Sequence, residues 1–123
     1  MKLRIKGNSI RLRLLKSEVE KFAEHGYISD EVRFGTGTLR YSVRMSGSAD
    51  AIKGTFADNE IVVVIPEKAA IDWAGNESVG FEVEQPIAAN ESLTIVIEKD
   101  FVCLDRPDDP DRADAYPNPN MEC

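Results

Sequence analysis

The sequence is poor in the residues from which most enzymatic and metal-binding sites are built. Its 123 residues include one histidine, two cysteines and one tryptophan. The two cysteines, Cys103 and Cys123, provide no disulfide framework of the kind that holds small secreted domains together. Thiols stay reduced in the cytoplasm, so we expect a cytoplasmic protein. Because no nucleophile motif, phosphate-binding loop or closely spaced metal-ligand pair is present, we expect no cofactor and favour a protein without enzymatic activity.

Long hydrophobic runs are also absent. The longest, from Ile61 to Pro66, is far shorter than the roughly 20 residues that span a bilayer. The basic start, "MKLRIKGN", is followed by no apolar segment of signal-peptide length, so we expect neither export nor membrane insertion. With 42% hydrophobic and 30% charged residues, the chain has the composition of one soluble domain with its own core.

The net charge of −7 is distributed unevenly along the chain. Residues 1–45 contain ten Lys and Arg against five Asp and Glu, whereas residues 46–123 contain five against seventeen. The basic part either forms a patch for an anionic partner or complements the acidic part, within the fold or across a homodimer. We favour the complement within the fold. The overall acidity argues against nucleic acid, because phosphate contacts supply most non-specific affinity.

Alternating apolar and polar residues predict eight strands. Gly7-Asn8 is a typical two-residue hairpin turn, which would place Ile5 opposite Ile10 and Arg4 opposite Arg11. Like charges that face each other in this way repel unless an anion or an acidic neighbour lies between them. The remaining strands are predicted at "YISDEVRF", "TLRYSVRM", "AIKGTF", "EIVVVIP", "VGFEVEQP" and "SLTIVIEKD".

Two short segments have the pattern of helices. "KSEVEKFAEHG" combines a Ser17–Glu20 capping box with a terminal glycine, Gly26. "PEKAAIDWAG" begins with Pro66 and ends with Gly75. Trp73, on this second helix, is expected to pack in the core.

The order of the elements predicts the fold class. Two strands, a helix and two strands follow one another twice, which suggests an internal duplication. Eight strands are enough to curl into a barrel or to split into two packed sheets. We predict an α+β fold, with a mainly antiparallel β-barrel or strongly curved sheet and two short helices in residues 1–104. An acidic, proline-rich strap, residues 105–123, is expected to dock on that domain.

Charged residues alternate with apolar ones along several predicted strands, which makes them candidates for ligand binding. The candidates are Arg11, Arg13, Arg40, Arg44, Glu82 and Glu84. In a barrel lumen these side chains would form a tunnel for metal and polyphosphate, as in the triphosphate-tunnel phosphohydrolases. Simple alternation, with charges in water and apolar side chains inside, explains the same pattern and is favoured. Pro86 stands where the tunnel signature has a further basic residue.

The C-terminal strap is the other candidate site. It holds five aspartates between Asp105 and Asp114, and carboxylates are ligands for hard cations such as calcium. The candidate metal ligands are Cys103, Asp105, Asp108 and Asp109. The glycine turn and the closing glutamate of calcium loops are missing, and prolines within the acidic run favour an extended segment. His25 with both cysteines lacks the paired spacing of zinc ligands.

Three blocks of the sequence, "SIRLRLLKSEVEKF", "IDWAGNESVGFEVEQP" and "IEKDFVCLDR…YPNP", resemble a small family of uncharacterised bacterial proteins of about this length. The resemblance extends from end to end and implies a stand-alone bacterial cytosolic domain. It implies no activity, so no catalytic residue is carried over from it.

The sequence therefore favours a small, non-enzymatic binding or interaction module. Its partner would be a protein or a small anionic ligand, and a homodimer is one form it could take. The alternative is a metal-dependent phosphohydrolase of the triphosphate-tunnel type, which would use Glu82, Glu84 and the arginines.

Overall fold

The computed structural model describes residues 1–101, and all ten predicted elements are present in them. In chain order they are β1 (Lys2–Lys6), β2 (Ser9–Leu14), α1 (Lys16–His25), β3 (Tyr27–Arg33), β4 (Thr38–Ser46), β5 (Lys53–Ala57), β6 (Glu60–Pro66), α2 (Glu67–Gly75), β7 (Gly80–Ala88) and β8 (Glu91–Lys99). The α+β class is confirmed. The strap, the proposed domain boundary at residue 104 and the four candidate metal ligands lie outside the described residues.

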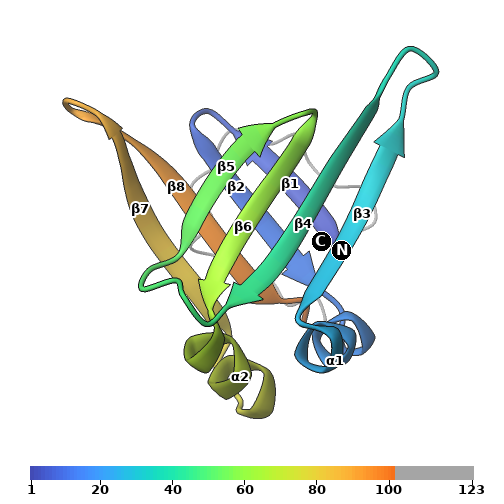
Figure 1. Cartoon of the computed structure of the whole chain (residues 1–123), viewed down its shortest axis with the longest axis vertical. Helices are drawn as coiled ribbons and strands as arrows, with labels where there is room; N and C mark the ends of the chain where they lie inside the picture. The colour runs from blue at the N-terminus through green and yellow to red at the C-terminus, as the bar shows by residue number, and fades with distance from the viewer. Residues whose placement is uncertain (102–123) are drawn as a thin grey trace, which may run out of the picture.

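The strands form two four-stranded sheets, not one closed barrel. Sheet A has the order β1-β2-β8-β7 and sheet B the order β3-β4-β6-β5, and Figure 1 shows sheet B lying in front of sheet A. The prediction of a barrel or strongly curved sheet is therefore wrong for residues 1–101. The pairing is mainly antiparallel, as predicted, with one parallel pair at the centre of each sheet, β2 with β8 and β4 with β6.

Side chains join the edges of the two sheets where a barrel would have a continuous strand ladder. The Gln85 side chain, on edge strand β7 of sheet A, hydrogen-bonds the backbone of Gly54 on edge strand β5 of sheet B. The Gly54 N–H donates to Oε1 at 2.6 Å, and Nε2 donates to the Gly54 carbonyl at 3.0 Å. A single side-chain amide satisfies two groups of an edge strand, so this contact ties the sheets together without closing them.

The suggested repeat is present in the topology. Each half contributes a hairpin, a helix and a hairpin, and each sheet combines one hairpin from each half. The equivalent turns, Gly7-Asn8 and Asp58-Asn59, both use left-handed backbone, with φ of 54° at Gly7 and 52° at Asp58. The central pairings are equivalent as well, since Ile10 aligns with Ile95 in sheet A and Ile61 aligns with Tyr41 in sheet B.

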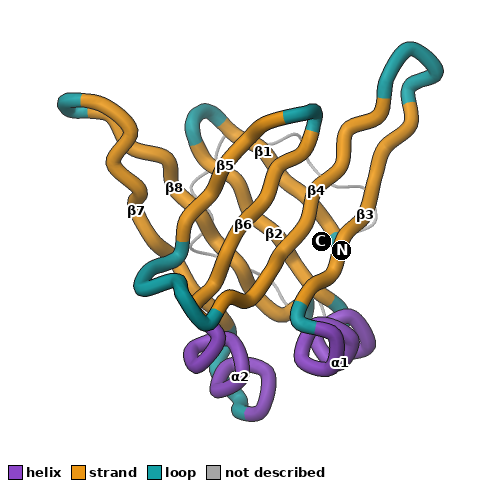
Figure 2. The backbone as a smooth tube through the Cα atoms, viewed as in Figure 1, coloured by secondary structure: helices purple, strands orange, loops and turns teal. Residues whose placement is uncertain are grey.

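The core lies between the sheets and is closed at one end by the helices. Both helices lie at the same end of the strands, as Figure 2 shows. Phe22 of α1 and Trp73 of α2 are buried there, and their ring centroids are 6.2 Å apart. The other buried apolar residues are Ile10, Leu12, Leu14, Val19, Tyr41, Val43, Val63, Ile65, Ala70, Ile95, Val96 and Ile97.

The ends of α1 differ in part from the prediction. The helix begins at Lys16, so Ser17 lies inside its first turn and the Ser17–Glu20 capping box does not form. Glu18 accepts the backbone N–H of Leu15 at 2.8 Å instead. Gly26 ends the helix with a φ of 82°, a left-handed conformation that glycine adopts without steric cost. Neither helix of residues 1–101 has the length and apolar character needed to cross a membrane.

Candidate functional site

The arginines of β2 lie on the outer face of sheet A. Leu12 and Leu14 point into the core, so Arg11 and Arg13, which alternate with them, point away from it. Both contact one carboxylate of β8. Arg13 Nε lies 2.7 Å from Glu98 Oε1, and Arg11 Nη1 lies 3.5 Å from the same oxygen. In these ion pairs, basic residues from the first part of the chain are neutralised by an acidic residue from the second part, the arrangement within the fold that we favoured from the uneven distribution of charge.

The arginines of β4 lie on the outer face of sheet B. Arg40 Nη2 lies 3.3 Å from Glu31 Oε2, and Arg44 Nη2 lies 3.7 Å from Glu60 Oε2. The inward residues between them belong to the core. Because sheets A and B pack through their inner faces, the two arginine pairs lie on opposite sides of the sandwich. They do not form one four-arginine anion site.

The two glutamates of β7 are exposed on the outer face of sheet A. Glu84 accepts hydrogen bonds from the hydroxyls of Ser92 (2.9 Å) and Thr94 (2.8 Å). The tunnel mechanism requires Glu82 and Glu84 to line a lumen together with the arginines. The sheets of residues 1–101 enclose no such lumen, since the space between them is filled by the apolar core.

No group of three or more histidine, cysteine or acidic side chains is placed to hold a metal ion in residues 1–101. The predicted ligands Cys103, Asp105, Asp108 and Asp109 are outside that range. His25 is exposed at the C-terminal end of α1, where the helix dipole favours a cation.

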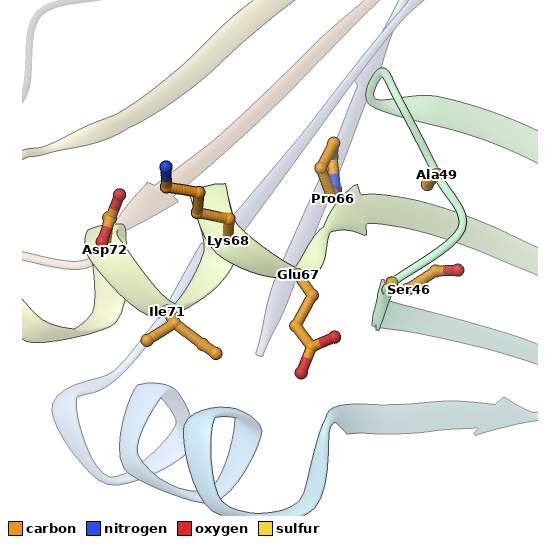
Figure 3. A pocket seen from close by; sticks show the side chains of 8 residues that line it. Ser46, Ala49, Pro66, Glu67, Lys68, Ile71 and Asp72 are labelled. Carbon is orange, nitrogen blue, oxygen red and sulfur yellow. The ribbon is translucent and has the colours of Figure 1, made fainter.

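A shallow cleft of about 410 Å³ lies between the β4–β5 loop and the start of α2. Figure 3 shows its side chains, with Lys68 and Asp72 on one side of α2 and Glu67 and Ile71 on the other. The two acidic groups, Glu67 and Asp72, therefore do not converge on one point. The lining residues are Ser46, Gly47, Ala49, Pro66, Glu67, Lys68, Ile71 and Asp72.

Tyr41 is a titratable group within the core. Its side chain is 8% exposed, and its hydroxyl donates to the carbonyl oxygen of Met1 at 3.2 Å. Burial raises the pKa of Tyr41 above its ordinary value of 10.0, and the negative charges of Asp30 and Glu18 raise it further. Both effects oppose formation of the phenolate.

This raised pKa predicts a loss of stability in alkali. The neutral phenol is favoured in the folded state, so its contribution to the free energy of unfolding is complete below pH 10. That contribution is lost as pH rises from 10 through the pKa of the folded state. Tyr41→Phe should show a smaller loss of stability over this window in urea denaturation. Tyr27→Phe is the control, because Tyr27 is 55% exposed and its variant should follow the native curve. A Tyr41→Phe curve parallel to the native one would contradict the prediction.

Five of the ten large apolar residues that are exposed in residues 1–101 form an apolar rim at the end of the sandwich opposite the helices, and the other five, Leu15, Tyr27, Ile71, Val79 and Phe101, lie at or next to the helical end. All four hairpin turns lie at this open end, and the β3–β4 and β7–β8 hairpins spread apart beyond the other two (Figure 1). Phe34 is 67% exposed, Phe56 68% and Ile5 59%. In each strand, the alternation of inward and outward residues assigns these side chains to the inward face. The apolar rim consists of Ile5, Val32, Phe34, Phe56 and Ile87.

The apolar rim was not among the predicted site residues. Alternation alone assigns these side chains to the inner faces, and inner-face residues are expected to be buried. The missed signal is their position, since each stands within a few residues of a turn. There the opposing sheet no longer covers them. The β3–β4 and β7–β8 hairpins form two long arms, which extend beyond the strands next to them. Their length follows from the register, because Arg40 is the first β4 residue that pairs with β6 and Thr94 is the first β8 residue that pairs with β2.

The comparisons with known proteins give a family without an assigned activity. A family model described as "Family of unknown function (DUF7009)" matches residues 1–120. No curated protein and no solved structure matches the chain. The resemblance to an uncharacterised family, inferred from the three sequence blocks, is confirmed. The chain belongs to the DUF7009 family of unknown function.

Proposed function

We propose that this protein is a non-enzymatic interaction module whose open end binds a second copy of the chain, so that two sandwiches meet rim to rim in a homodimer. The observation that carries the proposal is the apolar rim. Five large apolar side chains are exposed near the four hairpin turns, and exposed apolar surface of this kind marks an interaction site. Phe34 and Phe56, on opposite edges of sheet B, are the two aromatic residues of the rim, and aromatic side chains are enriched at interfaces.

The charges around the rim favour a second copy as the occupant. The hairpins of the first half bring Lys6 and Arg33 to the open end, and those of the second half bring Asp58 and Glu91. A two-fold dimer can set the first half of one copy against the second half of the other. Opposite charges then meet around an apolar centre, which is the usual arrangement of a self-complementary interface.

The pseudo-symmetry of the fold supports the same occupant. The spread arms, β3–β4 and β7–β8, occupy equivalent places in the two halves. Each carries an exposed large apolar residue near its turn, Phe34 on one arm and Ile87 on the other. An arm of one copy can therefore pack between the two arms of its partner, so that the apolar side chains of both copies are buried.

Removing the two aromatic anchors should separate the dimer. Burial of a phenylalanine contributes about 1.5–3 kcal/mol, and 1.4 kcal/mol corresponds to tenfold in affinity. The double variant Phe34→Ser, Phe56→Ser should therefore raise the dissociation constant of the dimer on the order of 100-fold or more. Sedimentation velocity over a concentration series measures this directly.

The control is Ile71→Ser, which changes a residue that is 52% exposed on α2 at the opposite end. It should leave the dimer intact. Equal melting temperatures for the native protein and the double variant at low concentration would show that the fold is unchanged. A native protein that sediments as a monomer at every concentration would overturn the proposal, as would a dimer that survives the double substitution.

A further inference from the structure

The outer face of the β1–β2 hairpin carries five cations. Leu3 and Ile5 point inward opposite Leu12 and Ile10, so the residues that alternate with them point outward. We call this surface the basic face; it consists of Lys2, Arg4, Lys6, Arg11 and Arg13. The hairpin itself contains no acidic residue. This surface lies on the outside of sheet A and meets the apolar rim only at Lys6, beside the Gly7-Asn8 turn.

The pairing of the strands places like charges opposite one another. Arg4 aligns with Arg11, and Lys2 aligns with Arg13. Cross-strand pairs of like charge are destabilising unless an anion lies near them. Glu98 of β8 contacts Arg13 and Arg11 from one side of the hairpin. An anionic segment lying along the hairpin would stabilise both like-charged pairs together.

The chain leaves sheet A beside this face. The backbone N–H of Asp100 donates to the Leu14 carbonyl at 2.8 Å, and the Asp100 carboxylate lies 2.9 Å from Lys2 Nζ. Because β8 runs parallel to β2, the next residues begin at the Lys2 end of the basic face. The described part of the chain thus ends where the row of cations starts.

The strap that follows has the matching charge. Residues 105–123 contain six acidic residues and two arginines. Residues along one face of a strand repeat at about 6.8 Å, so the three cations of β1 span about 14 Å. An extended segment covers up to about 3.5 Å per residue. The run from Asp105 to Asp114 can therefore extend along the whole basic face.

We propose that the strap docks on the basic face of its own chain, running from Lys2 toward the Gly7-Asn8 turn. The aspartates of the strap supply the anionic neighbours that the two like-charged pairs favour. The uneven charge of the sequence is then largely an intramolecular complement.

Paramagnetic broadening in the full-length protein tests this placement. A nitroxide is attached at Ala113→Cys in a chain that also carries Cys103→Ser and Cys123→Ser. Amide signals of β1 and β2 should lose several-fold more intensity than those of β3 and β5, the edges of sheet B. The selective loss should diminish in about 1 M salt, where the Debye length is about 3 Å.

Two matched charge variants decide whether the acidic residues cause the docking. Neutralising the five strap aspartates (Asp105, Asp108, Asp109, Asp111 and Asp114, each to Asn) should abolish the selective broadening. Neutralising five exposed carboxylates elsewhere (Glu20, Glu24, Asp50, Asp72 and Glu77, each to its amide) should preserve it. Broadening spread evenly over both sheets, or unchanged by the strap substitutions, would overturn the proposal.

A mixed sample separates docking within one chain from docking between chains. Spin-labelled protein without ¹⁵N is mixed with ¹⁵N-labelled protein without a spin label. Selective broadening of β1 and β2 in this mixture would place the strap on a second chain and contradict the intramolecular proposal. The measurement is repeated in protein that also carries Phe34→Ser and Phe56→Ser, which removes the aromatic residues of the rim. The outcome then does not depend on the proposed homodimer.

Discussion

Replacing Gly80 with alanine is expected to destabilise the fold by about 4 kcal/mol or more, a size reached by few single substitutions. Gly80 is the first residue of β7 and aligns with Glu98 of β8. A Cβ at this position would overlap the Ile97 carbonyl oxygen and lie 2.7 Å from the Glu98 Cα. Both atoms belong to the backbone of the neighbouring strand, so relief requires the β7–β8 ladder to separate at this point.

Gly75→Ala is the matched control for this substitution. Gly75 is five residues earlier, at the end of α2, and no atom lies within 4 Å of a Cβ built there. Alanine is favoured over glycine within helices by about 0.8–1 kcal/mol, so this variant should be as stable as the native protein or slightly more so. Urea denaturation followed by circular dichroism measures both. Equal midpoints for the two variants would show that β8 yields at Gly80, contrary to the prediction.

Trp73→Ala is expected to have the second large effect, a loss of about 3–5 kcal/mol. Trp73 is 2% exposed, and its ring lies between Phe22 and Phe81, with centroids 6.2 and 5.7 Å away. It closes the helical end of the core, so alanine would leave a cavity among residues of α1, α2 and β7. The melting temperature should fall by about 10 °C or more, since each kcal/mol corresponds to roughly 4–8 °C in domains of 60–100 residues and to less in larger ones.

Trp73→Phe separates the cavity from the hydrogen bond. The indole N–H donates to the Val79 carbonyl at 3.1 Å, but that carbonyl also accepts the backbone N–H of Lys99 at 2.9 Å. Phenylalanine therefore leaves no orphaned acceptor and should cost less than half as much as alanine. Ile71→Ala, on the exposed side of the same helix, should change the melting temperature little. A Trp73→Ala variant as stable as Ile71→Ala would show that Trp73 does not anchor the helix end.

The hairpin registers could be predicted because they depend on local signals. Gly7-Asn8 forms the expected turn, and it places Arg4 opposite Arg11 and Ile5 opposite Ile10 as predicted. Asp58-Asn59, the two-residue turn between β5 and β6, likewise places Phe56 opposite Ile61. In each case a two-residue turn sets the register, and alternation then assigns every side chain to a face.

The pairing between hairpins could not be read in the same way. Ile10 aligns with Ile95, and Tyr41 with Ile61, in parallel pairs that join the two halves of the sequence. No turn connects these strands directly, so no local residue sets their register. Gln85 and Gly54 are 31 residues apart in the sequence. Their edge contact likewise forms only because the two hairpins that carry them meet in space.

The faces on which the candidate residues lie could be predicted, but their arrangement relative to one another could not. Arg11 and Arg13 proved to be outward-facing, as the alternation favoured, and to contact Glu98, 85 residues from Arg13. Arg40 and Arg44 share their pattern but lie on the other sheet. Sequence periodicity states which face of a strand a residue occupies; it does not state which other strand shares that face.

The sequence by itself determined the ten elements, the α+β class and the family. These follow from turn dipeptides, period-two alternation, helix-ending glycines and the match over residues 1–120. Only the tertiary structure decided that the strands form two sheets, that the helices close one end, and that Phe34 and Phe56 are exposed at the other. The physical reason is that burial depends on which elements meet across the core. That meeting results from long-range packing and not from the residues near each position in the chain.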